Sequence, residues 1–149
     1  MLFRSQVDEH DVGSGLDARL LTSRAGSTKK VAVLAIGKMV GNALKAVDSL
    51  DGVSLEVWDV RSCQPLDPNM ISAAAAADVV VTIEDGIVEG GIGAAIAQSI
   101  SARAGHGPRV VNLGVPTRFL AHAKPDAILA TLGLDAAGIA ATIGDLARG

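Results

Sequence analysis

Three carboxylates stand close together in the stretch at residues 84–93 of this 149-residue sequence. Glu84, Asp85 and Glu89 could exchange protons as an acid–base cluster, because positioned carboxylates serve as general acids and bases. Acidic residues just ahead of a helix also complement the positive end of the helix dipole. We favour the second interpretation, and the spacing alone predicts no catalytic residue.

Three glycines, Gly90, Gly91 and Gly93, follow these acids and could form a phosphate-binding loop. The pattern matches neither G-x-G-x-x-G directly after a strand nor G-x-x-x-x-G-K-[ST]. Glycines at the start of a helix also let that helix pack closely on a strand or on another subunit. We favour packing or an interface, and anion binding stays open as the alternative.

Other positions add little chemistry. Gly37 ends an apolar run, and Arg118 and His122 lie in a loop from which they could reach a neighbouring chain, although a solvated loop is the favoured interpretation. The histidines and the single cysteine have no metal-ligand spacing, so we predict no metal site. No catalytic or cofactor-binding residue is predicted. The candidate interface or anion-loop residues are Gly37, Glu84, Gly90, Gly91, Gly93, Arg118 and His122.

The elements that position these residues follow from the hydrophobic pattern. Residues 79–83 are apolar and β-branched, which predicts a strand buried on both faces. A turn is predicted at residues 84–86, and Ile92, Ile96 and Ile100 then recur at helical spacing. In open α/β sheets such a turn lies at the carboxyl edge of the strands, where ligands usually bind.

The rest of the chain repeats this alternation. Strands are predicted at residues 31–36, 53–60 and 109–113, with a short one at 18–22, and helices are predicted at about 40–50, 68–77, 124–132 and after Asp135. Asp67 and Asp135 are predicted helix caps. The pattern predicts a three-layer α/β fold: a mostly parallel sheet of about five strands with helices on both faces. Residues 1–17 are predicted to be an arm or linker, and residues 18–149 one domain.

Composition narrows the class of protein. The net charge is −3, and without clustered cations we predict no nucleic-acid partner. One cysteine permits no internal disulfide, which is typical of a reducing compartment, so a cytoplasmic location is expected. Without an apolar run of roughly 18 residues we predict no membrane span. Residues 1–11 lack the apolar core of a signal peptide.

Aromatic residues make up only 2% of the sequence, so the hydrophobic core must consist of Val, Ile, Leu and Ala.

Several motifs together resemble a known family. They are IGKMV at residues 36–40, DVRSCQPLD at 59–67, VTIED at 81–85 with GGIG at 90–93, and NLGVP at 112–116. This set resembles the C-terminal domain of the transketolase-like thiamine diphosphate enzymes. FLAHAK at residues 119–124 and LGLDAAGI at 132–139 narrow the resemblance to the C-terminal (third) domain of the 1-deoxy-D-xylulose-5-phosphate synthases.

The resemblance implies a role in a transferase of isoprenoid precursor synthesis. Enzymes of that family condense pyruvate with glyceraldehyde 3-phosphate, and they hold thiamine diphosphate and Mg²⁺ through a Gly-Asp-Gly…Asn motif in another domain. Here the one Gly-Asp pair, Gly144-Asp145, is followed by Leu146. The resemblance therefore implies a packing and dimerisation role, no cofactor bound by this chain alone, and no catalysis alone. The implied partners are the catalytic domains of the same enzyme and a second copy across a dimer.

Alternatives stay open. The chain could be a free-standing module that binds small anions or nucleotides at its glycine turns, or a purely structural dimerisation domain. It could also be the C-terminal domain of a different transketolase-like enzyme. The pyruvate dehydrogenase E1 β subunits share the R-x-x-x-P-L-D signature, here Arg61 to Asp67, but they lack the Gly-Leu-Asp-Ala-Ala-Gly pattern found here after Leu132.

Overall fold

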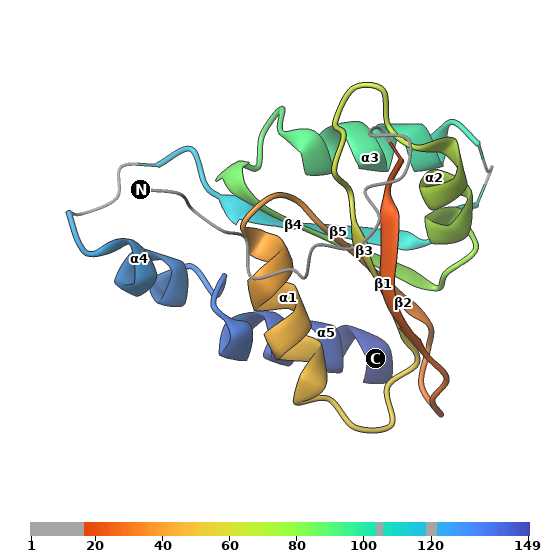
Figure 1. The fold of residues 1–149 in the computed structure, drawn as a ribbon, viewed down its shortest axis with the longest axis horizontal. Helices are drawn as coiled ribbons and strands as arrows, with labels where there is room; N and C mark the ends of the chain where they lie inside the picture. The colour runs from red at the N-terminus through yellow and green to blue at the C-terminus, as the bar shows by residue number, and fades with distance from the viewer. Residues whose placement is uncertain (1–16, 104–105, 119–121) are drawn as a thin grey trace.

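A five-stranded sheet lies between two layers of helices, in a computed structural model that describes residues 17–103, 106–118 and 122–149 (Figure 1). The predicted three-layer, mostly parallel α/β fold is confirmed. The strands are β1 (Arg19–Arg24), β2 (Val31–Ala35), β3 (Leu55–Asp59), β4 (Val79–Ile87) and β5 (Arg109–Val115). The helices are α1 (Met39–Asp48), α2 (Pro68–Ala75), α3 (Ile92–Ser101), α4 (Pro125–Thr131) and α5 (Ala136–Arg148).

The strand order is β1-β3-β2-β4-β5. β2 pairs in parallel with both β3 and β4, and β4 pairs in parallel with β5. β1 runs antiparallel to β3, with Arg19 opposite Asp59. The first residue of β1 therefore lies at the same edge of the sheet as the last residues of the parallel strands, and we call this edge the carboxyl edge.

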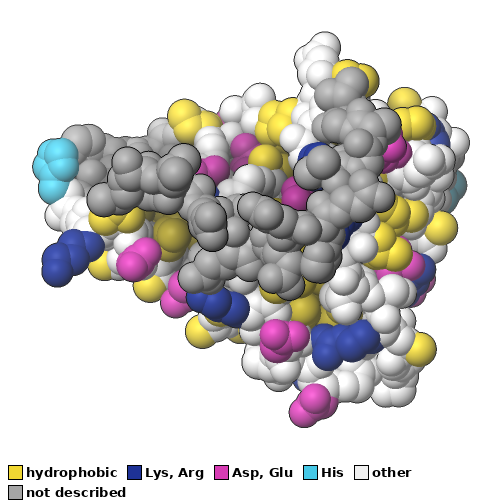
Figure 2. Space-filling model, viewed as in Figure 1, with side chains coloured by type: hydrophobic (Ala, Val, Ile, Leu, Met, Phe, Trp, Pro, Cys, Tyr) yellow, Lys and Arg dark blue, Asp and Glu magenta, His cyan; other side chains and the backbone are white. Residues whose placement is uncertain are grey.

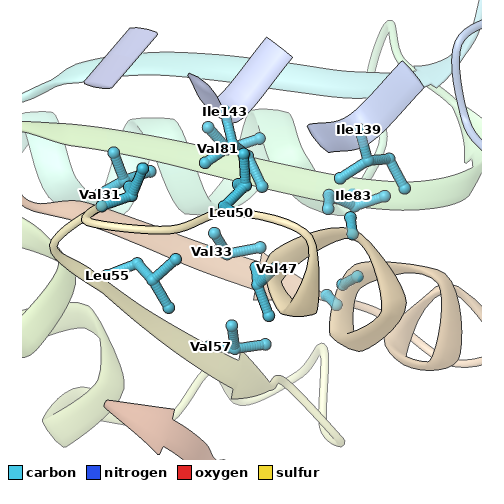
Figure 3. Packing of buried hydrophobic residues seen from close by; sticks show 14 of the residues in the cluster. Val31, Val33, Val47, Leu50, Leu55, Val57, Val81, Ile83, Ile139 and Ile143 are labelled. Atoms are coloured by element: carbon cyan, nitrogen blue, oxygen red, sulfur yellow. The ribbon is translucent and has the colours of Figure 1, made fainter. Parts of the chain in front are cut away.

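The two faces of the sheet bury separate apolar clusters. Every residue of β2 is buried, and its side chains alternate between the two clusters, as expected for a central parallel strand. α1 and α5 cover one face, and α2 and α3 cover the other (Figure 1). Figure 3 shows the first cluster, where side chains from β2, β3 and β4 meet those from α1 and α5. The labelled members are Val31, Val33, Val47, Leu50, Leu55, Val57, Val81, Ile83, Ile139 and Ile143.

The predicted turn at residues 84–86 is wrong. β4 continues through this segment to Ile87, which lies opposite Val115 of β5 after a shift in the pairing register. The backbone N–H of Val88 then donates to the carbonyl oxygen of Val115 at 2.9 Å. Backbone pairing with β5 thus holds the polar segment extended, which side-chain polarity could not indicate.

Both predicted helix caps are confirmed. The Oδ1 atom of Asp67 accepts hydrogen bonds from the N–H groups of Asn69 (2.7 Å) and Met70 (3.3 Å) at the start of α2. The Oδ1 atom of Asp135 accepts one from the N–H of Gly138 at 2.9 Å. Each carboxylate satisfies amide groups that have no partner within the helix.

Helices α4 and α5 together form an apolar segment, Pro125–Arg148, that by length and composition could cross a membrane. Gly133, at φ +70°, divides it into helices of 7 and 13 residues. A membrane-spanning helix needs about 20 residues, so neither helix is long enough by itself. Ile139 and Ile143 of α5 are fully buried against the sheet, so the apolar character of α5 serves the core.

The described chain begins at the carboxyl edge. The carbonyl oxygen of Asp17 accepts a hydrogen bond from Nη1 of Arg61 at 3.3 Å, and the N–H of Ala18 donates to Oδ2 of Asp67 at 2.8 Å. Residues 1–16 of the predicted arm lie outside the described residues, so the arm stays a prediction.

Replacing Asp67 tests the cap. Asp67→Ala removes the acceptor for the amides of Asn69, Met70 and Ala18 and should lower the free energy of unfolding by about 2 kcal/mol. Urea denaturation followed by circular dichroism measures the change. Asp145→Ala, at an exposed position of α5, is the control and should change stability by less than about 0.5 kcal/mol. Equal effects of the two substitutions would contradict a capping role.

Candidate functional site

The carboxyl edge gathers most of the candidate residues. Gly37, at φ +59°, follows β2, and Lys38 next to it forms an ion pair of 3.0 Å with Asp85 of β4. Glu84, Gly91 and Gly93 meet where β4 gives way to α3. Gly90, at φ +73°, is exposed in the same connection. Arg118 and His122 are both exposed in the segment between β5 and α4. Neither is among the residues that contact Glu84 in the described part of the chain.

Glu84 is buried, with 5% of its surface exposed, and its carboxylate points at the start of α3. Its Oε2 atom accepts a hydrogen bond from the N–H of Gly93 at 2.6 Å. Hydrogen bonds from amides to ionised carboxylates are short and strong, and the positive end of the helix dipole adds to the attraction. Glu84 therefore acts as the missing cap, because the N-cap residue, Gly91, has no side chain.

The glycines leave space for this carboxylate. A Cβ atom on Gly91 would lie 2.2 Å from Oε1 of Glu84 and 2.3 Å from the carbonyl oxygen of Ile87. A Cβ atom on Gly93 would lie 2.4 Å from Oγ1 of Thr82 and 2.9 Å from Oδ1 of Asn112. A Cβ atom at either position would require neighbouring atoms to move, so both glycines serve the close packing of α3.

Thr82 and Asn112 extend the polar cluster across the sheet. They lie opposite each other on β4 and β5, and the hydroxyl of Thr82 donates to Oδ1 of Asn112 at 2.7 Å. Thr82 is fully buried, and this hydrogen bond satisfies its hydroxyl. Because Gly93 has no side chain, α3 can pack close to the Thr82 and Asn112 side chains of the two strands.

A helix N-terminus attracts anions, and here an anion of the chain itself occupies the position. An external phosphate at the start of α3 would have to displace the Glu84 carboxylate from the Gly93 amide. The geometry therefore favours packing over anion binding for these glycines. The sequence pattern favoured packing or an interface but left anion binding open, because both uses require the same glycines before the same helix.

The loop after β3 supplies residues that sequence reasoning did not place at the site. The N–H of Arg61, at φ +58°, donates to Oδ1 of Asp59 at 3.1 Å. Burial raises the pKa of the Asp59 carboxyl above its usual value, although that hydrogen bond and the charges of Arg61 and Arg19 oppose the rise. Burial also raises the pKa of the Cys63 thiol, and the negative charge of Glu84 raises it further. Cys63 therefore lies within electrostatic reach of Glu84.

The opposite, amino edge of the sheet holds a hollow of about 530 Å³. It is lined by Lys29, Asp78, Val79, Arg109, Asp145, Leu146 and Gly149. Charges of both signs surround it, and one of its carboxylates, Asp78, already accepts a hydrogen bond from the N–H of Lys30 at 2.8 Å. Figure 2 likewise shows cationic and anionic side chains interspersed over the described part of one molecular face.

Comparisons with known proteins agree with the fold. A protein-family model described as "Transketolase, C-terminal domain" matches residues 22–139. The 1-deoxy-D-xylulose-5-phosphate synthase of Cupriavidus necator is 43% identical over 129 residues, which cover 86% of this chain and 19% of that protein. The synthase of Pseudomonas savastanoi pv. phaseolicola is 37% identical over 145 residues, 97% of this chain and 21% of that protein.

A solved structure described as "Split gene transketolase, inactive beta4 tetramer" superposes with a TM-score of 0.74 at 30% identity. The match covers 88% of this chain and 42% of that chain. The sequence matches fall on the C-terminal region of the synthases, and this chain spans about one fifth of their length.

A matched pair of glycine substitutions tests the packing of α3. Gly91→Ala should lower the free energy of unfolding by about 2–3 kcal/mol, because its Cβ would collide with Glu84 and the Ile87 carbonyl. Gly41→Ala, in α1, adds a Cβ with nothing within 4 Å and should instead stabilise the helix by about 0.5–1 kcal/mol. Thermal and urea unfolding measure both. A tolerated Gly91→Ala would show that Glu84 does not need the space.

The thiol of Cys63 reports the charge of Glu84. Because the negative carboxylate helps to raise the thiol pKa, Glu84→Gln should lower that pKa and speed the reaction of Cys63 with a disulfide reagent at pH 8. Cys63 is the only cysteine, so the measured rate belongs to it alone. In denaturant, wild type and variant should react equally. Equal rates in the folded proteins would contradict the electrostatic contact.

Proposed function

This chain belongs to the transketolase C-terminal domain family, and from that membership we propose that it is the packing and dimerisation domain of a 1-deoxy-D-xylulose-5-phosphate synthase. One observation carries the proposal: the matches cover most of this chain but only about one fifth of each synthase, at its C-terminal region. A domain of this kind acts by binding the part of the enzyme that holds the cofactor and the substrates.

The described residues do not fit the metal-bound cofactor. They contain no group of three or more His, Cys, Asp or Glu side chains that could hold a metal ion. The Gly93 amide at the start of α3, which could otherwise contact a diphosphate, donates to the carboxylate of Glu84. We therefore assign thiamine diphosphate and Mg²⁺ to other domains of the enzyme, and we assign this chain no catalytic residue.

In the proposed assembly, those other domains condense pyruvate with glyceraldehyde 3-phosphate and release CO₂ for isoprenoid precursor synthesis in the cytoplasm. The present chain contributes a folded domain in which Thr82 donates a hydrogen bond to Asn112 and Glu84 accepts one from the Gly93 amide. A second copy of the chain would lie across the dimer.

The solved split-gene transketolase supports a domain that has no activity by itself. That protein is described as an inactive tetramer of β chains, and it shares this fold at 30% identity. By analogy, we expect the present chain to be inactive without the remaining domains of the enzyme. The synthase relatives also favour this enzyme over the E1 β type of transketolase-like enzyme.

An activity assay tests the proposal. The purified chain, given pyruvate, glyceraldehyde 3-phosphate, thiamine diphosphate and Mg²⁺, should form no deoxyxylulose phosphate. The tagged chain, recovered from lysate of its own host, should bring down a polypeptide with the Gly-Asp-Gly…Asn motif, and that eluate should form the product. Omission of thiamine diphosphate is the control and should abolish turnover. Turnover by the purified chain alone would contradict the assignment.

A further inference from the structure

The described sheet has two edge strands, β1 and β5. An unpaired edge strand can pair with another chain, and proteins usually protect such an edge with charges or irregular backbone. β1 has arginines at both ends, Arg19 and Arg24, and an irregular pairing register between Leu20 and Thr22. β5 carries one charge, on its first residue, Arg109, and the rest of the strand is uncharged. β5 is therefore the less protected of the two edges.

Alternate residues of β5 direct their backbone groups away from β4. The N–H of Arg109 donates to the carbonyl oxygen of Asp78 at 3.3 Å, and the carbonyl oxygen of Val115 accepts from Val88 at 2.9 Å, so the odd-numbered residues bond to the β4 side. In a parallel pair, the residues between them point both their N–H and their C=O groups to the other side. No described strand lies on that side. We call these outward backbone groups the β5 edge; they belong to Val110, Asn112 and Gly114.

The sequence around the β5 edge is suited to pairing with itself. Pro108 and Pro116 stand four residues before and four residues after Asn112, and neither has an N–H to donate. Antiparallel pairing of two copies would use the donors between these prolines and would be centred on Asn112. Val110 would then lie opposite Gly114 of the second copy. All the outward residues would form hydrogen-bonded pairs, with about six hydrogen bonds in total.

The side chain of Asn112 suits the central position. Its Oδ1 atom accepts a hydrogen bond from the hydroxyl of Thr82 at 2.7 Å, and its NH₂ group has no hydrogen-bond partner among the described residues. Side chains that face each other across an antiparallel pair have Cβ atoms about 4.5–5.5 Å apart. Each NH₂ group could therefore donate to the Oδ1 atom of the facing asparagine.

Helix α3 would meet its copy at a normal packing distance. α3 crosses above the gap between β4 and β5, because Gly93 approaches both Thr82 and Asn112. A two-fold axis between the paired β5 strands would keep both α3 helices on the same face of the sheet, two strand spacings apart. At about 4.8 Å per spacing the helix axes would be roughly 10 Å apart, and packed helices are usually about 8–10 Å apart.

The surface of α3 is suited to this contact. The chain contains no charged residue from Gly90 to Ala102, so no like charges of α3 would meet across the two-fold axis. The exposed side chains of α3 are small or uncharged: Ala95, Gln98 and Ser101. On this face of the described sheet only α2 lies beside α3, so the other side of α3 has no neighbouring helix (Figure 1).

We propose that the β5 edge pairs in antiparallel orientation with the β5 edge of a second copy of this chain, centred on Asn112, and that α3 packs beside its copy. The two five-stranded sheets would form one continuous sheet. A two-fold contact is closed, so only the protected β1 strands would remain as edges and no fibre would grow. The proposal rests on the proposed function for its occupant, the second copy, and adds the surface, the register and the side chains in contact.

Amide hydrogen exchange of the unmodified chain tests the proposal. Exchange is followed residue by residue by NMR in dilute and in concentrated solution, and light scattering gives the mass in each. The amides of Val110, Asn112 and Gly114 should exchange at least about tenfold more slowly in the concentrated, dimeric sample. The amide of Val111, which faces β4, is the internal control and should exchange slowly in both.

Two results would overturn pairing at the β5 edge. One is a chain that stays monomeric in concentrated solution, and the other is a dimer in which exchange of the three outward amides is unchanged. Neither result prevents the tagged chain from recovering an active eluate, so the proposed function would survive. Protected outward amides together with an eluate that lacks the catalytic polypeptide would instead contradict the proposed function and leave the pairing intact.

A substitution at the β5 edge gives an independent measure. Val110→Pro removes an outward N–H and no bond to β4, so it should weaken association of the two copies by at least about tenfold. Circular dichroism checks that the variant is folded. Leu20→Asp, at an exposed position of the β1 edge, is the matched control and should associate like wild type. Undiminished association of a folded Val110→Pro chain would contradict the proposal.

Discussion

The buried carboxylate of Glu84 is the constraint on which the carboxyl edge depends. A charge so far from water is tolerable only when donors and dipoles compensate for its lost hydration, and the Gly93 amide and the α3 N-terminus do so. The contact ties the end of β4 to the start of α3. It also requires glycine at position 91, because a Cβ atom there would collide with the Glu84 carboxylate, while Thr82 and Asn112 leave no room for one at position 93.

Much of the fold could be predicted from residue patterns. Continuous apolar strands, periodic isoleucines and the caps at Asp67 and Asp135 each have one physical interpretation, and the structure confirms them. The end of β4 could not be predicted, since Glu84, Asp85 and Gly86 are polar or flexible and are typical of turns. Only the pairing of Ile87 with Val115, far away in sequence, keeps that segment extended.

The candidate site was harder to predict than the fold. Glycines before a helix serve phosphate binding and close packing equally well, and the deciding fact is where the nearest carboxylate points. The sequence analysis named Glu84, but its hydrogen-bond partner, the Gly93 amide, depends on how β4 and α3 are placed in the fold. The electrostatic link between Glu84 and Cys63 also spans separate elements, and no local pattern encodes it.

The strand order has a consequence for how the chain is made. β1 leaves the ribosome before β2 and α1, yet its only pairing partner in the described sheet is β3, which is synthesised after both. Until β3 emerges, β1 is a nascent strand with unpaired backbone groups, the kind of segment that chaperones protect. The hydrogen bond from the Ala18 amide to Asp67 can form only later still, because Asp67 follows β3 in the chain. The first described residues of the domain thus reach their native contacts only after later segments of the chain have been made.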